Sequence, residues 1–184
     1  SPMTLNKSVR IKARTLNGST WSALREAVIG VGAINDNLRI SELMYNPGGD
    51  PNEEFIELMN TGSAAINLNQ VAFTKGIDFT FGDTVLNAGL RLILVRNQPV
   101  VEARYGTSLP VVGQYAGSLD NAGEKLRLCD IAGQTIQELE YNNSWYEITD
   151  GDGFSLTAVN PAYDKTAVSD ANLDARWTFN EASG

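Results

Sequence analysis

The segment from Leu38 to Leu68 most strongly constrains the fold, because it contains two alternating strands joined by a turn. In the first strand, alternate apolar residues are expected to share one face: Leu38, Ile40 and Met44. The run from Asn46 to Asn52 gathers Asn, Pro, Gly and Asp, which favour a turn. The second strand repeats the alternation, with one face formed by Ile56 and Leu58 and the other by Phe55, Glu57 and Met59. This pattern predicts paired, half-buried strands in an all-β protein.

Five stretches, taken in this order, resemble the lamin tail domain family in its bacterial form. They are ISELMYNP from Ile40, EEFIELMNTG from Glu53, LRLILV from Leu90, GSLDNAGEKLRLCD from Gly117 and GDGFSL from Gly151. The resemblance extends from about Leu38 to about Trp177. It implies an immunoglobulin-like antiparallel β-sandwich, a fold found at the end of nuclear lamins and in many secreted bacterial proteins. It also implies a domain without catalytic activity.

The N-terminal residues predict a β-hairpin of their own. Ser8 to Leu16 alternates apolar and basic side chains, Asn17-Gly18 favours a tight turn, and Trp21 to Ile29 runs back as the partner strand. The pair resembles the last two strands of fibronectin-like or chitobiase C-terminal-like modules. We therefore expect residues 1–33 to be the remnant of an upstream β module and residues 34–184 to form the lamin-tail-like domain. Because a lone hairpin is marginally stable in water, it should dock on the sandwich or form a homodimer with a second molecule.

One short helix is expected in addition to the strands. Pro99 to Tyr105 has a proline suited to a first turn, and Gly106 follows as a stop signal. Leu90 to Val95 is the most continuously apolar run and is the expected central strand. Near the C-terminus, Trp177 is expected to pack against the sandwich.

Charge and cysteine content limit the partners and the chemistry. The chain has 22 acidic and 14 basic side chains, a net charge of −8, so it should repel a phosphate backbone and bind no nucleic acid. It has no apolar run long enough for a membrane span. Its single cysteine, Cys129, cannot form an internal disulfide and is expected to be buried and inert.

Catalysis is not expected, although one pair of carboxylates must be considered. The chain has no histidine, which removes His-based triads, His general bases and His-ligated zinc. Glu42 and Glu57 should lie on neighbouring strands, and a pair of carboxylates is what a glycosidase requires. The alternative is that each is a solvent-facing or ion-paired strand residue, with Arg39 or Arg91 as the partner.

Two further groups are candidate binding residues. Asp150 and Asp152 alternate with glycines, as calcium-binding loops often do, but Pro161 stands where an EF-hand would need its last glutamate. A plain turn is the alternative, and no cofactor is expected apart from this possible calcium ion. Three aromatic residues lie near two asparagines and could hold a sugar or cover the end of the core: Tyr141, Trp145 and Tyr146.

The expected function is therefore a non-catalytic accessory binding or interaction domain of a larger bacterial protein. The resemblance implies an extracellular or cell-surface location, with a protein or a surface polymer as the partner. Two alternatives remain open. One is a carbohydrate- or calcium-binding module, and the other is an intracellular structural tail like that of lamins.

Overall fold

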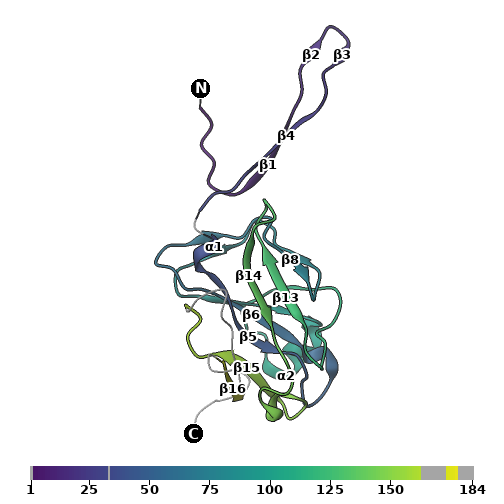
Figure 1. The fold of residues 1–184 in the computed structure, drawn as a ribbon, viewed down its shortest axis with the longest axis vertical. Helices are drawn as coiled ribbons and strands as arrows, with labels where there is room; N and C mark the ends of the chain where they lie inside the picture. The colour runs from purple at the N-terminus through teal and green to yellow at the C-terminus, as the bar shows by residue number, and fades with distance from the viewer. Residues whose placement is uncertain (1, 33, 163–172, 178–184) are drawn as a thin grey trace.

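Two β-sheets packed face to face form the body of the protein, and a β-hairpin projects from one end of this sandwich (Figure 1). The computed structural model describes residues 2–32, 34–162 and 173–177. The predicted all-β, immunoglobulin-like sandwich is confirmed.

The larger sheet contains six strands, in the spatial order β12 (Val111–Gln114), β11 (Arg91–Val95), β6 (Phe55–Asn60), β5 (Leu38–Met44), β15 (Phe154–Ala158) and β16 (Leu173–Trp177). The smaller sheet has the order β14 (Thr135–Glu140), β13 (Lys125–Cys129), β8 (Ala72–Lys75) and β9 (Phe79–Thr80). A short ladder pairs β7 (Ile66–Asn67) with β10 (Val85–Leu86). Among the strands described, β11 and β12 pair in parallel, whereas the other pairs are antiparallel. The side chain of Trp177 lies outside the described residues, so its predicted contact stays a prediction.

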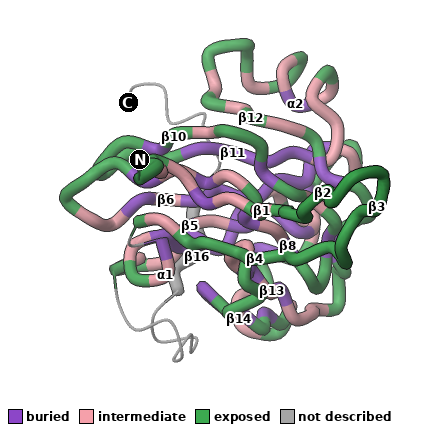
Figure 2. The backbone as a smooth tube through the Cα atoms, turned by 90° about the horizontal axis from the view of Figure 1, so that it is seen from above, coloured by how far each residue is buried: buried purple, intermediate pink, exposed green. Residues whose placement is uncertain are grey.

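The hydrophobic core lies between the two sheets and is filled by alternate residues of the facing strands (Figure 2). From the larger sheet, four core residues are at most 4% exposed: Ile40, Ile56, Leu58 and Leu92. The smaller sheet contributes Phe73, Leu126, Leu128, Ile136 and Leu139. Cys129 is also buried, as predicted, with its Sγ 3.4 Å from the hydroxyl of Thr74.

A β-bulge in β5 changes which of its residues face the core. Ile40 pairs with Leu58 and Glu42 pairs with Glu57, so Ser41 is an extra residue in this strand. The alternation therefore reverses after Ile40. Leu43 and Tyr45 face the core, while Met44 lies on the opposite face of the sheet. The prediction that Met44 shares a face with Leu38 and Ile40 is wrong for this reason.

The helix α2 (Gln98–Tyr105) covers part of the outer face of the larger sheet. The Asn97 side chain accepts a hydrogen bond from the Val100 N–H, and Gly106, with a φ of +88°, ends the helix. Its buried Val101 packs on outward-facing residues of three strands: Met44, Phe55, Ile93 and Val95. The predicted helix is confirmed.

A second helix, α1 (Ile34–Asn37), precedes β5 and was not predicted. Its Asn and Asp residues usually favour loops, because their side chains compete for backbone hydrogen bonds. Burial of Ile34 in the core holds this turn in place. The 3-10 turns η1 (Pro51–Glu53) and η2 (Glu147–Thr149) lie in the loops at the other end of the sandwich. In the part of the chain described, no helix combines the length and apolar character that a membrane crossing needs.

The projecting hairpin, residues 8–30, is called the arm below. In it β1 (Val9–Ala13) pairs with β4 (Arg25–Ile29), and β2 (Leu16–Asn17) pairs with β3 (Thr20–Trp21) farther out. Figure 1 shows the arm standing away from the sandwich. At its base, the Asn69 side chain donates to the Ser8 carbonyl at 2.8 Å, and Lys7 forms an ion pair with Asp83. The structure thus does not show the arm docked on its own sandwich, and pairing with a second molecule stays a prediction.

Candidate functional site

A pocket of about 350 Å³ lies at the end of the sandwich that is remote from the arm, between the loop before β13 and the loop after β14. Its lining consists of Gly123, Glu124, Glu140, Tyr141, Asn142 and Trp145. Two of the three predicted aromatic residues, Tyr141 and Trp145, therefore meet at one site. The third, Tyr146, packs against the core and does not line the pocket.

The antiparallel pairing of β13 with β14 positions the pocket walls. Lys125 pairs with Glu140, and the Tyr141 N–H donates to the Glu124 carbonyl at 3.1 Å, so both loops leave the sheet side by side. Gly123 has a φ of +109°, and a Cβ at this position would lie 2.4 Å from the Tyr141 carbonyl oxygen. A glycine is therefore required where the two loops approach each other.

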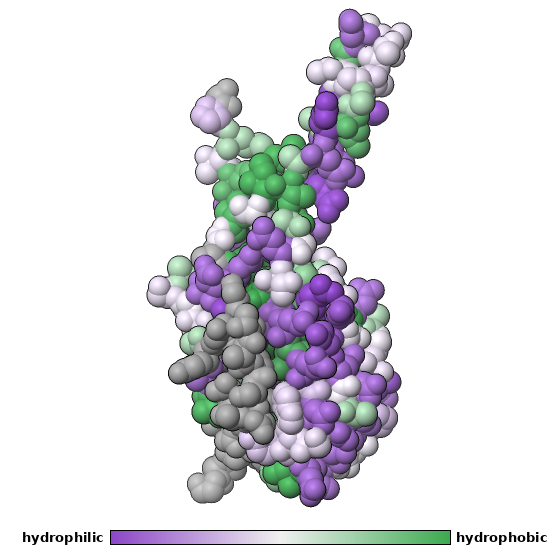
Figure 3. All heavy atoms as spheres, viewed as in Figure 1, coloured by the Kyte–Doolittle hydropathy of each residue, from purple (hydrophilic) through white to green (hydrophobic). Residues whose placement is uncertain are grey.

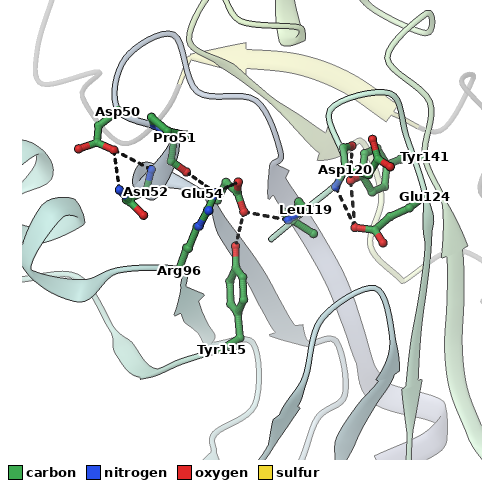
Figure 4. A network of polar contacts seen from close by, with 10 residues as sticks. All are labelled: Asp50, Pro51, Asn52, Glu54, Arg96, Tyr115, Leu119, Asp120, Glu124 and Tyr141. Atoms are coloured by element: carbon green, nitrogen blue, oxygen red, sulfur yellow. Dashed lines mark hydrogen bonds and ion pairs between the residues drawn. The ribbon is translucent and has the colours of Figure 1, made fainter. Parts of the chain in front are cut away.

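Tyr141 forms the floor of the pocket and cannot serve as an exposed platform, because only 1% of it is exposed. Its ring packs on Tyr45 with 5.0 Å between the ring centroids. Its hydroxyl donates to the Asp120 carbonyl at 2.8 Å and to Glu124 Oε1 at 3.4 Å (Figure 4). Burial, reinforced by the Glu124 carboxylate, raises the pKa of Tyr141, so the hydroxyl remains a donor.

Trp145 supplies the aromatic wall of the pocket. Its indole is partly exposed and also packs against the core. The turn that places it is held by the Asn142 side-chain oxygen, which accepts from the Ser144 N–H at 2.9 Å, and by a bond from the Trp145 N–H to the Asn142 carbonyl. The polar lining is formed by the Asn142 amide and the carboxylates of Glu124 and Glu140.

A buried carboxylate, Glu54, supports the loop beside the pocket (Figure 4). Its Oε1 accepts from Arg96 at 2.6 Å, and its Oε2 accepts from the Tyr115 hydroxyl at 3.1 Å and the Leu119 N–H at 2.9 Å. The next residue, Asp120, donates its N–H to Glu124 Oε1 at 3.0 Å. The 119–120 segment is therefore held by Glu54 on one side and by the pocket wall on the other.

Comparison with known protein families matches residues 33–143 to the lamin tail domain. The match includes more than half of the chain, in agreement with the resemblance inferred from the sequence. The chain belongs to the lamin tail domain family. Comparison with curated proteins found no match. In this lamin tail domain, β15 lies beyond the matched residues and still pairs with β5 in the larger sheet.

The two carboxylates considered for catalysis in this lamin tail domain are neighbours, as predicted. Glu42 and Glu57 pair directly across β5 and β6. Glu57 Oε1 accepts from the Ser41 hydroxyl at 2.6 Å and from Arg91 Nε at 3.0 Å, and Glu42 accepts from the Ser155 hydroxyl. The predicted Arg91 ion pair is therefore present, and both carboxylates are engaged within the sheet.

The buried Glu57 is expected to make stability depend on pH. Burial raises the pKa of Glu57 above its ordinary value of 4.5, against the opposing effect of Ser41 and Arg91. The folded state then holds the proton more tightly, so this contribution to stability is present below pH 4.5 and is lost as the pH rises through the raised folded pKa. We expect Glu57→Gln to remove that loss, so the variant should gain stability relative to the wild type between pH 4.5 and 7 in urea titrations.

Glu138→Gln is the matched control for that measurement. The hydrogen bond from Lys125 lowers the pKa of Glu138, so its contribution is present above pH 4.5 and is lost as the pH falls. The variant should therefore lose stability relative to the wild type as the pH rises. If the stability of both variants relative to the wild type changed in the same direction with pH, the opposite pKa shifts of Glu57 and Glu138 would be contradicted.

The predicted calcium residues lie on the same end of the domain but not in a cluster of acidic ligands. Asp150 accepts from the amides of Asn46 at 2.6 Å and Asn143 at 3.0 Å, one on each carboxylate oxygen. Asp152 is exposed. Within residues 2–32 and 34–162, no three His, Cys, Asp or Glu side chains come together as a metal site would require. Gly48 packs closely against the 151–153 turn, which explains the glycine-rich sequence of the facing loop.

Sequence reasoning found Tyr141, Trp145 and Asn142 but missed Glu140, which directly precedes Tyr141, and the two residues from the loop before β13. Gly123, Glu124 and Glu140 carry no motif of their own. Only the pairing of β13 with β14 brings them together. The Asn121-Ala122-Gly123 sequence does predict the turn before β13, but it does not indicate that this turn lies beside the loop after β14.

Proposed function

We propose that this lamin tail domain is a non-catalytic binding domain of a larger secreted or surface protein, and that its pocket holds one sugar residue of a surface polymer. The observation that supports this is the pocket itself, where the Trp145 indole stands beside hydrogen-bonding side chains. Sugars offer an apolar C–H face to an aromatic ring and hydroxyl groups to polar neighbours. The volume of about 350 Å³ lies at the small end of ligand pockets, which suits one ring.

The charge of the pocket determines the class of sugar. Glu124 and Glu140 carry negative charge, and Lys125, 3.3 Å from Glu140, is shared with Glu138. Carboxylates accept hydrogen bonds from hydroxyl and ammonium groups, but they repel another carboxylate. The pocket therefore favours neutral or amino sugars over uronic and sialic acids.

The absence of catalysis and the location are parts of the same proposal. The engagement of Glu42 and Glu57 by serine and arginine side chains supports a binding role over a hydrolytic one. The secreted or surface setting is supported by the sequence resemblance to the bacterial form of the family.

The proposal is tested by binding to an array of neutral, amino and acidic glycans, followed by titration of the best ligand. We expect Trp145→Ala to weaken binding by about tenfold or more, because it removes the aromatic wall. Trp21→Ala, on the arm, is the matched control and should bind as the wild type does. Chelation of calcium should change nothing.

Three results would contradict the sugar site: no binding to neutral or amino glycans, equal loss in both tryptophan variants, or preference for acidic glycans. A thermal melt of each variant separates loss of the pocket from loss of the fold. Hydrolysis of a bound glycan that disappears in Glu57→Gln would overturn the non-catalytic role.

A further inference from the structure

The arm exposes large apolar side chains that its own sandwich does not cover. Leu16, Trp21 and Leu24 are each more than half exposed, and the Arg14 guanidinium stacks on the Trp21 ring at 4.4 Å from its centroid. Tryptophan and arginine are the residues most enriched at the energetic centres of protein interfaces. The outer part of the arm therefore has the composition of a contact surface.

The paired strands of the arm have two unlike faces. The register places Val9 opposite Ile29 and Ile11 opposite Ala27, so these four side chains share one apolar face. On the other face Glu26 pairs with Arg10 at 3.0 Å and Lys12 at 3.9 Å. Figure 3 shows hydrophobic residues gathered where the arm leaves the sandwich and a hydrophilic row along its other side. The charged side chains of one face form ion pairs with each other within the arm. The apolar face, in contrast, has no sheet packed on it.

Charge is divided unevenly between the arm and the rest of the chain. Residues 8–30 contain four basic side chains and one acidic one, a net charge of +3. Because the whole chain carries −8, the remainder carries −11. Two arms would therefore repel each other, while an arm and a sandwich attract.

We propose that the arm of one copy docks on the sandwich of a second copy of this chain. This contact covers the apolar face of the arm and brings its positive charge onto a negative body. Two copies related by a two-fold axis could exchange arms, so that each arm contacts the other copy. This inference concerns the arm alone and is independent of the sugar pocket.

The first test is the molar mass of the full chain by light scattering over a range of concentrations and salt. We expect self-association that weakens as salt rises. Trp21→Ala combined with Leu24→Ala should weaken it by about tenfold or more. Met3→Ala is the control, because Met3 is 72% exposed and lies outside both the arm and the sandwich.

The second test distinguishes arm-to-sandwich docking from pairing of two arms. Arg14→Glu with Arg25→Glu reverses two charges on the arm and leaves the sandwich unchanged. The reversed chain alone should be monomeric, but immobilised wild-type chain should still retain it through the wild-type arm. Self-association of the reversed chain alone would mean that two arms pair, because reversed arms of charge −1 repel each other less than wild-type arms of charge +3 do. A wild-type chain that stays monomeric at all concentrations would overturn self-docking. A different molecule would then be the partner of the apolar face of the arm.

Discussion

Glu54→Ala is expected to lower the free energy of unfolding by about 3 kcal/mol, toward the smaller end of the cost of breaking a buried ion pair. Glu54 is 2% exposed, and its removal leaves Arg96, the Tyr115 hydroxyl and the Leu119 N–H without their acceptor. The estimate stays low in the range because the Arg96 side chain is 30% exposed and can be hydrated. Equilibrium unfolding in urea at neutral pH measures the loss.

Two other variants locate the origin of this effect. Tyr115→Phe removes one hydrogen bond to Glu54 and should cost about 1 kcal/mol. Asp152→Ala changes an exposed carboxylate and should stay within about 0.5 kcal/mol of the wild type. If Glu54→Ala were no more damaging than Asp152→Ala, the network of Figure 4 would contribute nothing to stability. Glu54 holds Leu119, and the adjoining Asp120 contacts Glu124 of the pocket, so Glu54→Ala should also weaken the binding of a ligand in the pocket.

Gly123→Ala is expected to cost about 3 kcal/mol, as the sum of backbone strain and a steric clash. The φ of +109° disfavours any residue with a Cβ, and that atom would lie 2.4 Å from the Tyr141 carbonyl oxygen and 2.8 Å from the Asn142 Cα. Both contacts are with backbone, which cannot rotate away as a side chain could. The melting temperature should fall by roughly 6 to 12 °C for a chain of this size.

Gly133→Ala separates the two causes, because it tests strain without the clash. Gly133 has a φ of +80° in the turn between β13 and β14, and a Cβ there would meet nothing within 4 Å. It should cost about 1 kcal/mol. Equal losses at the two glycines would show that the contact with Tyr141 and Asn142 is unimportant.

The strands of the sandwich were predictable because each buries one face, and that requirement appears directly as alternation. The same rule failed within β5, where the extra residue Ser41 reverses the alternation and sends Met44 to the outer face. Nothing in the side chains of Ser41 or Glu42 indicates a bulge. The reversal depends on pairing with β6, a contact between distant residues that local patterns do not contain.

The pocket was only half predictable for a related reason. Trp145 and Asn142 are close in sequence, so their composition could be recognised directly. Glu124 belongs to a different loop and reaches the pocket through the pairing of β13 with β14. Tyr141 lies at the pocket, but its burial depends on Tyr45, which follows β5 of the larger sheet. The projecting position of the arm was likewise not determined by its strand pattern, which was compatible with docking.

Chemical modification of the single thiol can be used to follow local opening of this protein. Cys129 in β13 of the smaller sheet is 5% exposed, and the sequence has no other cysteine. An alkylating reagent can reach it only when β13 separates from its surroundings. The rate of thiol modification, read by mass spectrometry without any engineered label, therefore reports how often the chain around Cys129 opens.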